Sequence, residues 1–392
     1  MNTRILSVAL LAMATGCGTE LQSTANQATV DHASKPVQES ELPFEPLEVS
    51  PAAVRVYLSQ LAPMLVQREL TEAELSAVEW DGLAAVAPVL EAWTREPGFA
   101  EAARMLVSNK LSTGGVKDGI DFELPGNLAA YVAKNDLPLS TLLTAEYCVN
   151  AAGEKISCDT GAPFQAGVLT TRAYMKSRVS RFNLTRASTL MSVFACKEYP
   201  MSESFQPRLE RTLLIPMFQA NTVEEQTDPN AGGGFGNGAA CYSCHGQFGA
   251  HAQLFVRFDS EGVYRPDATG IQDPAAEPGV SSKGLMTSHL QDPVSAASDA
   301  SQILGESVEN LAQAARVLVQ SPEFWACQAE NLLQYAFGIT RANEFDPRVA
   351  QEIAEAARRD GTTEPSMGAF AVETFTHPRV IKAVIEGLGA QP

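Results

Sequence analysis

The sequence predicts a mainly α-helical protein in which helical modules are joined by long loops. Apolar residues recur at helical spacing along most of the chain, whereas alternating runs of β-branched and polar residues, which are typical of strands, are scarce. The chain has 392 residues, of which 45% are hydrophobic, so it is long enough for two or three packed modules.

The first residues, MNTRILSVALLAMATGCGTE, have the features of an export signal. Arg4 precedes an apolar run that is too short to cross a bilayer but suits the hydrophobic part of a signal peptide. The run ends in ATGC, which resembles the lipobox of bacterial lipoproteins, where the cysteine is lipidated. We expect a signal peptide over residues 1–16 and a lipid on Cys17, which anchors an outer-membrane lipoprotein on its periplasmic or cell-surface face. An ordinary cleavable signal is the alternative.

Residues 17–50 are rich in Ser, Thr, Gln, Glu and Pro, and they predict a flexible tether because they contain too little apolar surface to offset the entropy of folding. The formal net charge of the chain is −18. Because this charge repels phosphate backbones, we do not expect nucleic acid as a partner.

Helical patterns begin at Pro51 and define a first helical module over residues 51–220. We expect a helix from Pro51, a second that begins at the capping box Thr71 to Glu74 and extends to Trp93, a third after Pro97, and two more that are separated at Pro138. Residues 221–240 and 266–301 are loops by composition. Helical patterns return after the second loop, break at Pro322 and continue to the C-terminus.

The stretch CYSCH, from Cys241 to His245, has the spacing that covalent attachment of haem c requires. The two thiols add to the two vinyl groups of the porphyrin, and the imidazole of the next residue, His245, is then placed to ligate the iron. We therefore expect one haem c per chain. Three alternatives are a zinc site that His245 and His251 complete, a thioredoxin-like redox pair, and a structural disulfide.

The sixth ligand of the iron is less well defined by the sequence. Met286 lies in a glycine-rich loop after the motif, where small c-type cytochromes commonly place a methionine, and it is the leading candidate. His289, His251 and an open position are the alternatives. Arg257 and Arg265 are candidate partners of the haem propionates, although a surface position explains them equally. Phe248, Phe255 and Phe258 are candidates for the wall of the haem pocket or for the core.

Four cysteines remain, an even number that suits two disulfides in an oxidising compartment. Cys148 and Cys158 flank a short polar loop, which favours a local disulfide. Cys196 and Cys327 would then form the second pair, and the alternative is that both are buried thiols.

Three stretches resemble the multi-module c-type cytochrome proteins of environmental Gram-negative bacteria, whose domains have no assigned function. They are LPLSTLLTAEYCVN with AGVLTTRAYMKSRVSRFNLTRASTLMSVFAC, then CYSCHGQFGAHAQLFVRFDSEGVYR, and LVQSPEFWACQAENLLQYAFG. The resemblance implies a cytochrome-c-like haem module over residues 221–320, flanked by helical modules over 51–220 and 321–392. By position, Cys241 and Cys244 are the thioether sites and His245 is the proximal ligand. The chain departs from the family at Gly249 to His251, where an Asp-Pro turn is usual.

These observations favour an exported lipoprotein that transfers single electrons through one haem c to a redox partner protein. An electron carrier is the leading interpretation. The alternatives are a haem enzyme of the peroxidase-like or oxidative type with an open sixth position, and a noncatalytic surface scaffold.

Overall fold

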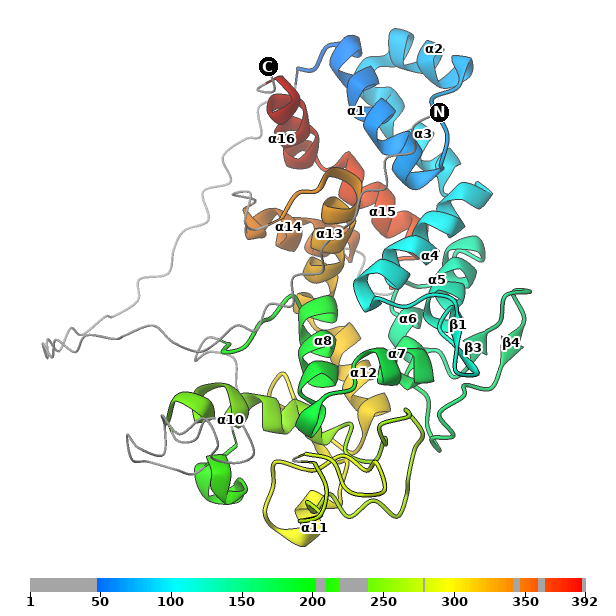
Figure 1. The fold of residues 1–392 in the computed structure, drawn as a ribbon. Helices are drawn as coiled ribbons and strands as arrows, with labels where there is room; N and C mark the ends of the chain where they lie inside the picture. Colours follow the sequence, from blue (N-terminus) through cyan, green and yellow to red (C-terminus); the bar gives the residue numbers. More distant parts are fainter. Residues whose placement is uncertain are drawn as a thin grey trace, which may run out of the picture. The chain divides into compact units, whose positions relative to one another are not determined.

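Helices make up most of the described chain, as the sequence predicts (Figure 1). The computed structural model describes residues 48–201, 209–218, 239–277, 279–340, 346–358 and 364–389, all of which belong to one compact unit, Pro46–Pro392. The predicted signal peptide, Cys17, most of the tether and most of the loop over residues 221–240 lie outside the described residues.

The first half of the chain contains eight of the described α-helices. They are α1 (Pro51–Leu65), α2 (Glu72–Asp81), α3 (Val86–Trp93), α4 (Pro97–Leu111), α5 (Leu124–Lys134), α6 (Thr141–Thr144), α7 (Arg172–Ser177) and α8 (Leu184–Phe194). The later helices are α10 (Ala239–Gln253), α11 (Pro293–Ala296), α12 (Leu311–Gln320), α13 (Pro322–Phe337), α14 (Pro347–Ala357), α15 (Met367–Thr376) and α16 (Pro378–Gly389).

The described strands are short and form antiparallel hairpins. The pairs are β1 (Val116–Lys117) with β2 (Ile120–Asp121), β3 (Cys148–Val149) with β4 (Lys155–Ile156), and β5 (Ser301–Ile303) with β6 (Glu306–Val308). None of the described helices is both long and apolar enough to cross a membrane.

Helix starts follow the predicted capping chemistry. Ser50 caps α1, and its hydroxyl accepts a hydrogen bond from the Ala53 amide. The capping box is confirmed, because the Thr71 side chain accepts from the Glu74 amide while Glu74 accepts from the Thr71 amide. Pro322 begins α13, as the predicted break requires.

The prediction of one helix from the capping box to Trp93 is wrong. The α2 helix ends at Asp81, a 3-10 turn follows over Gly82–Ala85, and α3 then continues to Trp93. Gly82 has φ +55°, a left-handed conformation that glycine adopts at little cost and that interrupts the helix.

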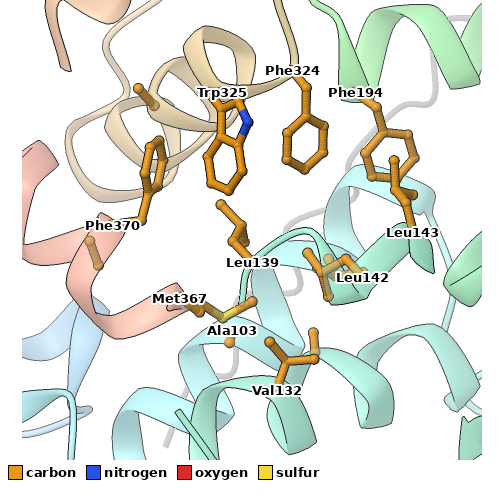
Figure 2. Close-up of a cluster of buried hydrophobic side chains, with 14 of the residues drawn as sticks. Ala103, Val132, Leu139, Leu142, Leu143, Phe194, Phe324, Trp325, Met367 and Phe370 are labelled. Atoms are coloured by element: carbon orange, nitrogen blue, oxygen red, sulfur yellow. The ribbon is translucent and has the colours of Figure 1, made fainter. Parts of the chain in front are cut away.

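The two ends of the chain share one core. The α1 helix packs against α13 and α16, and α3 packs against α15, so helices of residues 51–220 contact helices of residues 321–392. Figure 2 shows this core, in which Trp325 and Phe370 meet Leu139, Leu142 and Met367. Both flanking segments thus contribute to the same buried cluster. The division of the chain into three modules stays a prediction from the sequence.

Both predicted cysteine pairs lie at disulfide distance. Cys148 and Cys158 have their sulfurs 2.09 Å apart, and Cys196 and Cys327 have theirs 2.15 Å apart. The second pair joins the chain just after α8 to α13, across 131 residues of sequence. It therefore links the α8 region, which packs against α10, to the shared core.

Candidate functional site

The CYSCH motif lies on the helix α10. Cys241, Cys244 and His245 fall at positions i, i+3 and i+4 of this helix, so the backbone places all three on one side of it. The side chain of Cys241 is outside the described residues, and Cys244 is partly buried. The helical backbone thus places the three motif positions within about one turn, as the predicted haem attachment needs.

The imidazole of His245 is buried among aromatic rings, with 8% of the residue exposed. Its Nδ1 lies 3.1 Å from Nε2 of His289, which is 1% exposed. Phe218 stacks on the His245 ring, with centroids 4.2 Å apart and planes 19° apart. Phe248 lies on the same helix, with its ring centroid 5.8 Å from that of His245.

Burial keeps these imidazoles neutral at ordinary pH. It lowers the pKa of His245 to about 4, and burial together with the nearby His245 lowers the pKa of His289 well below its usual value. A neutral imidazole has a lone pair that can bind a metal ion. The site therefore holds His245 in the protonation state that ligation requires.

Met286, the leading candidate for the sixth ligand, is 1% exposed, and its backbone pairs with Val280. The described hydrogen bond of His245 and one of its ring contacts are made with His289, and none of its described contacts is with Met286. Whether Met286 ligates the iron stays a prediction.

His251, a second alternative ligand, lies one and a half turns after His245 on α10 and has its own partner. Its Nδ1 shares a hydrogen bond with the hydroxyl of Tyr199, and the Tyr199 ring packs against Phe248 with centroids 3.9 Å apart. Burial raises the pKa of Tyr199 well above its usual value and lowers that of His251 to about 4. Phe248 therefore packs between His245 and the pair formed by the partly buried Tyr199 and the buried His251.

A buried arginine holds the turn at Phe258 and Asp259, which we call the FD turn and which follows α10. Arg186 on α8 is fully buried, and its guanidinium donates to the carbonyl oxygens of Phe258 and Asp259 at 2.8 and 2.7 Å. It also donates to the Met175 carbonyl and to Asn183 Oδ1. The bonds to Phe258 and Asp259 fix the chain after the motif to α8, and the other two fix the guanidinium to the segment before α8.

The candidate propionate partners are engaged by the protein itself. Arg265 Nε donates to Asp259 Oδ2 at 2.8 Å, and Arg257 Nε lies 3.5 Å from Asp299 Oδ1. Each arginine thus has a carboxylate partner within the protein, and a role toward haem propionates stays a prediction. Phe255 and Phe258, in contrast to Phe248, are fully buried in the core, where Phe255 stacks on Tyr174.

A separate apolar pocket lies within the helical core. Leu65, Phe99, Leu142 and Phe370 line it together with parts of α4 and α13. It contains none of the predicted site residues, and its wall is that of a hydrophobic core, so it carries no functional assignment.

Haem c and the zinc alternative both stay predictions, because the side chain of Cys241, which belongs to both, lies outside the described residues. Among the described side chains, no group of three or more His, Cys, Asp or Glu lies together as a metal site would require. Haem c would take two cysteines and one neutral imidazole from the protein, and the motif places residues of these types within about one turn of α10.

Comparison of the chain with family models, with curated proteins and with solved structures finds no match. The family resemblance therefore stays an expectation from the sequence.

Sequence reasoning missed three residues that build this site: Phe218, Tyr199 and Arg186. Phe218 and Tyr199 precede the motif and carry no pattern of their own. Arg186 is preceded by Phe182 and Asn183, which have φ of +54° and +59°, and the sequence NLTR gives no sign of this conformation.

Proposed function

We propose that the protein binds one haem c through thioether bonds to Cys241 and Cys244, with His245 as proximal iron ligand, and that it transfers single electrons. The observation that carries the proposal is the buried, neutral imidazole of His245 on the same helix side as the two cysteines. The segment around α10 would then be the cytochrome-c-like module that the sequence resemblance implies.

The chain's own residues would orient the ligand and exclude water. The α10 helix sets the direction of His245 relative to both cysteines, while Phe218 and Phe248 cover its ring. The cofactor, when bound, supplies a one-electron couple at its iron. Burial of the ligand in an aromatic environment keeps solvent reorganisation small, which suits electron transfer.

We further propose that Cys17 carries a lipid and anchors the protein at the outer membrane, where a redox partner protein accepts or donates the electron. The export signal and the lipobox-like ATGC support this location. The two cysteine pairs at disulfide distance agree with an oxidising compartment.

The test is to produce the chain together with a cytochrome c maturation system and to extract it with acidic acetone. We expect the haem spectrum to stay with the polypeptide, and we expect Cys241→Ser with Cys244→Ser to abolish it. The matched control is Cys148→Ser with Cys158→Ser, which removes a disulfide but should keep the haem. A wild-type protein without covalent haem contradicts the proposal.

Carbon monoxide distinguishes the electron carrier from the haem enzyme. If Met286 completes the coordination, reduced protein does not bind carbon monoxide, and Met286→Ala makes the iron accessible to it. Binding to the wild type would favour the enzyme with an open sixth position, and an unchanged spectrum in Met286→Ala would remove Met286 as a ligand.

A further inference from the structure

The structure gives one nitrogen of the His245 imidazole a buried partner. His245 Nδ1 and His289 Nε2 are 3.1 Å apart, which is the length of a hydrogen bond. A bond from a metal to an imidazole nitrogen is about 2 Å long, so two imidazoles on opposite sides of one iron hold their nitrogens about 4 Å apart. The observed pair is therefore hydrogen-bonded, and it lacks the spacing of two ligands of one iron.

The packing of Phe218 supports the same conclusion. Its ring stacks on His245 at 4.2 Å and on His289 at 5.1 Å, with interplanar angles of 19° and 26°. A porphyrin between the two imidazoles would separate them, and one phenyl ring could not then keep contact with both. If His245 ligates the iron of a bound haem, the ligating atom would be Nε2, on the side of the ring away from His289.

The main chain holds His289 in this place. The His289 carbonyl oxygen accepts a hydrogen bond from the Ile215 amide at 2.8 Å. The neighbouring Ser288 donates from its hydroxyl to Gln253 Oε1 at 2.5 Å and from its amide to the Gly270 carbonyl at 2.9 Å. His289 is thus fixed on both sides of its own Cα.

The α10 helix is shaped to receive this segment. His245, Gly249 and Gln253 follow at positions i, i+4 and i+8, so they lie along one face of the helix. A Cβ at Gly249 would lie 3.2 Å from the Cβ of His289 and 2.7 Å from Leu209 Cδ1. Glycine at position 249 therefore permits the close approach that brings His289 beside His245.

We propose that His289 is a positioning residue that accepts the Nδ1–H hydrogen bond of His245 and leaves Nε2 of His245 to face the iron. The inference rests on the proposed haem site. Histidines that ligate metals usually donate their second ring N–H to an acceptor, which fixes the tautomer and the ring orientation and makes the ligand a stronger donor. Here the acceptor is the imidazole of His289, in place of a carboxylate or a backbone carbonyl.

The consequence is a lower reduction potential, because a stronger donor stabilises the oxidised iron. His289→Leu removes the acceptor and should raise the potential while the haem stays covalently attached. His289→Gln places an amide oxygen near the position of Nε2 and should return the potential toward the wild-type value. Phe370→Leu is the matched control, since it truncates a fully buried ring in the helical core away from this site and should leave the potential unchanged.

A measurement on the wild-type protein tests the inference without depending on whether a variant folds. In reduced protein labelled with ¹⁵N-histidine, with carbon monoxide bound if the sixth position is open, we expect a scalar coupling between His245 Nδ1 and His289 Nε2 across the hydrogen bond. Absence of this coupling overturns the inference.

The outcomes separate the inference from the proposed function. Wild-type protein without covalent haem contradicts the proposed function itself. Covalent haem with an equal potential in wild type and His289→Leu contradicts only the role of His289. A change of His289→Leu to high-spin iron that newly binds carbon monoxide also overturns it, because His289 would then be an iron ligand.

Discussion

Replacement of Arg186 by methionine tests how the haem-motif segment is held to the rest of the fold. Arg186 is fully buried, and its guanidinium donates four hydrogen bonds at 2.7–3.0 Å, three of them to main-chain carbonyl oxygens. Methionine keeps the aliphatic stem and leaves those acceptors without these donors. Each hydrogen bond to a charged group contributes about 1.5–3 kcal/mol, and the desolvation cost of the guanidinium offsets part of the sum.

We expect Arg186→Met to lower the free energy of unfolding by about 4 kcal/mol, because four buried acceptor oxygens lose their donor at about 1–3 kcal/mol each, less the desolvation cost of the guanidinium. The assay is urea unfolding followed by far-ultraviolet circular dichroism. The matched control is Arg55→Met on the exposed side of α1, where a change within about 0.5 kcal/mol is expected. If the two variants are equally stable, Arg186 does not hold the FD turn, and the reasoning is refuted.

Other parts of the fold give three further predictions. Glu74→Gln should cost about 3 kcal/mol at neutral pH. Although burial alone would raise the Glu74 pKa, hydrogen bonds from Arg68, Thr71 and Trp93 lower it to about 2. The stability that the ionised carboxylate contributes is therefore present above about pH 4.5 and is lost as the pH falls toward 2. The free energies of unfolding of wild type and variant should converge over that range. Replacing Cys196 and Cys327 with serine should lower the free energy of unfolding by about 4 kcal/mol, because the pair closes a 131-residue loop. An equal melting temperature for the wild type and this variant would argue against a disulfide between them. Burial lowers the pKa of His251 to about 4, so the unfolded state takes up the proton first and the stability of the fold decreases as the pH drops from about 6.5 to 4. His251→Gln should make the free energy of unfolding depend less steeply on pH in this range. An unchanged pH dependence would contradict the burial of a neutral imidazole.

Local signals in the sequence account for much of the fold. Three local signals predict helices that the structure confirms: the helical pattern that begins at Pro51, the capping box and the proline at the start of α13. Caps and amphipathic faces act over one or two turns, so they can be read locally. The break at Gly82 was missed because a single glycine is tolerated inside many helices and its left-handed φ depends on the surrounding packing.

The candidate site shows the same limit of local signals. The motif from Cys241 to His245 can be recognised from the spacing of its cysteines and histidine in the sequence, and the structure places it on one helix. The partners of its histidine come from elsewhere: Phe218 precedes the motif and His289 follows it, and only the tertiary fold brings them together. From the sequence, Met286 and His289 are alternatives for one role as the sixth ligand, whereas we propose a different role for His289 from its hydrogen bond to His245 Nδ1.

The central claim is that Cys241 and Cys244 hold one haem covalently with His245 as its ligand. The most direct measurement is the intact mass of the denatured chain, made with a cytochrome c maturation system and extracted with acidic acetone. We expect wild type to exceed its polypeptide mass by one haem, and the variant that replaces both motif cysteines with serine to show the polypeptide mass alone. A wild-type chain at its bare polypeptide mass would contradict the proposed function and, with it, the role of His289.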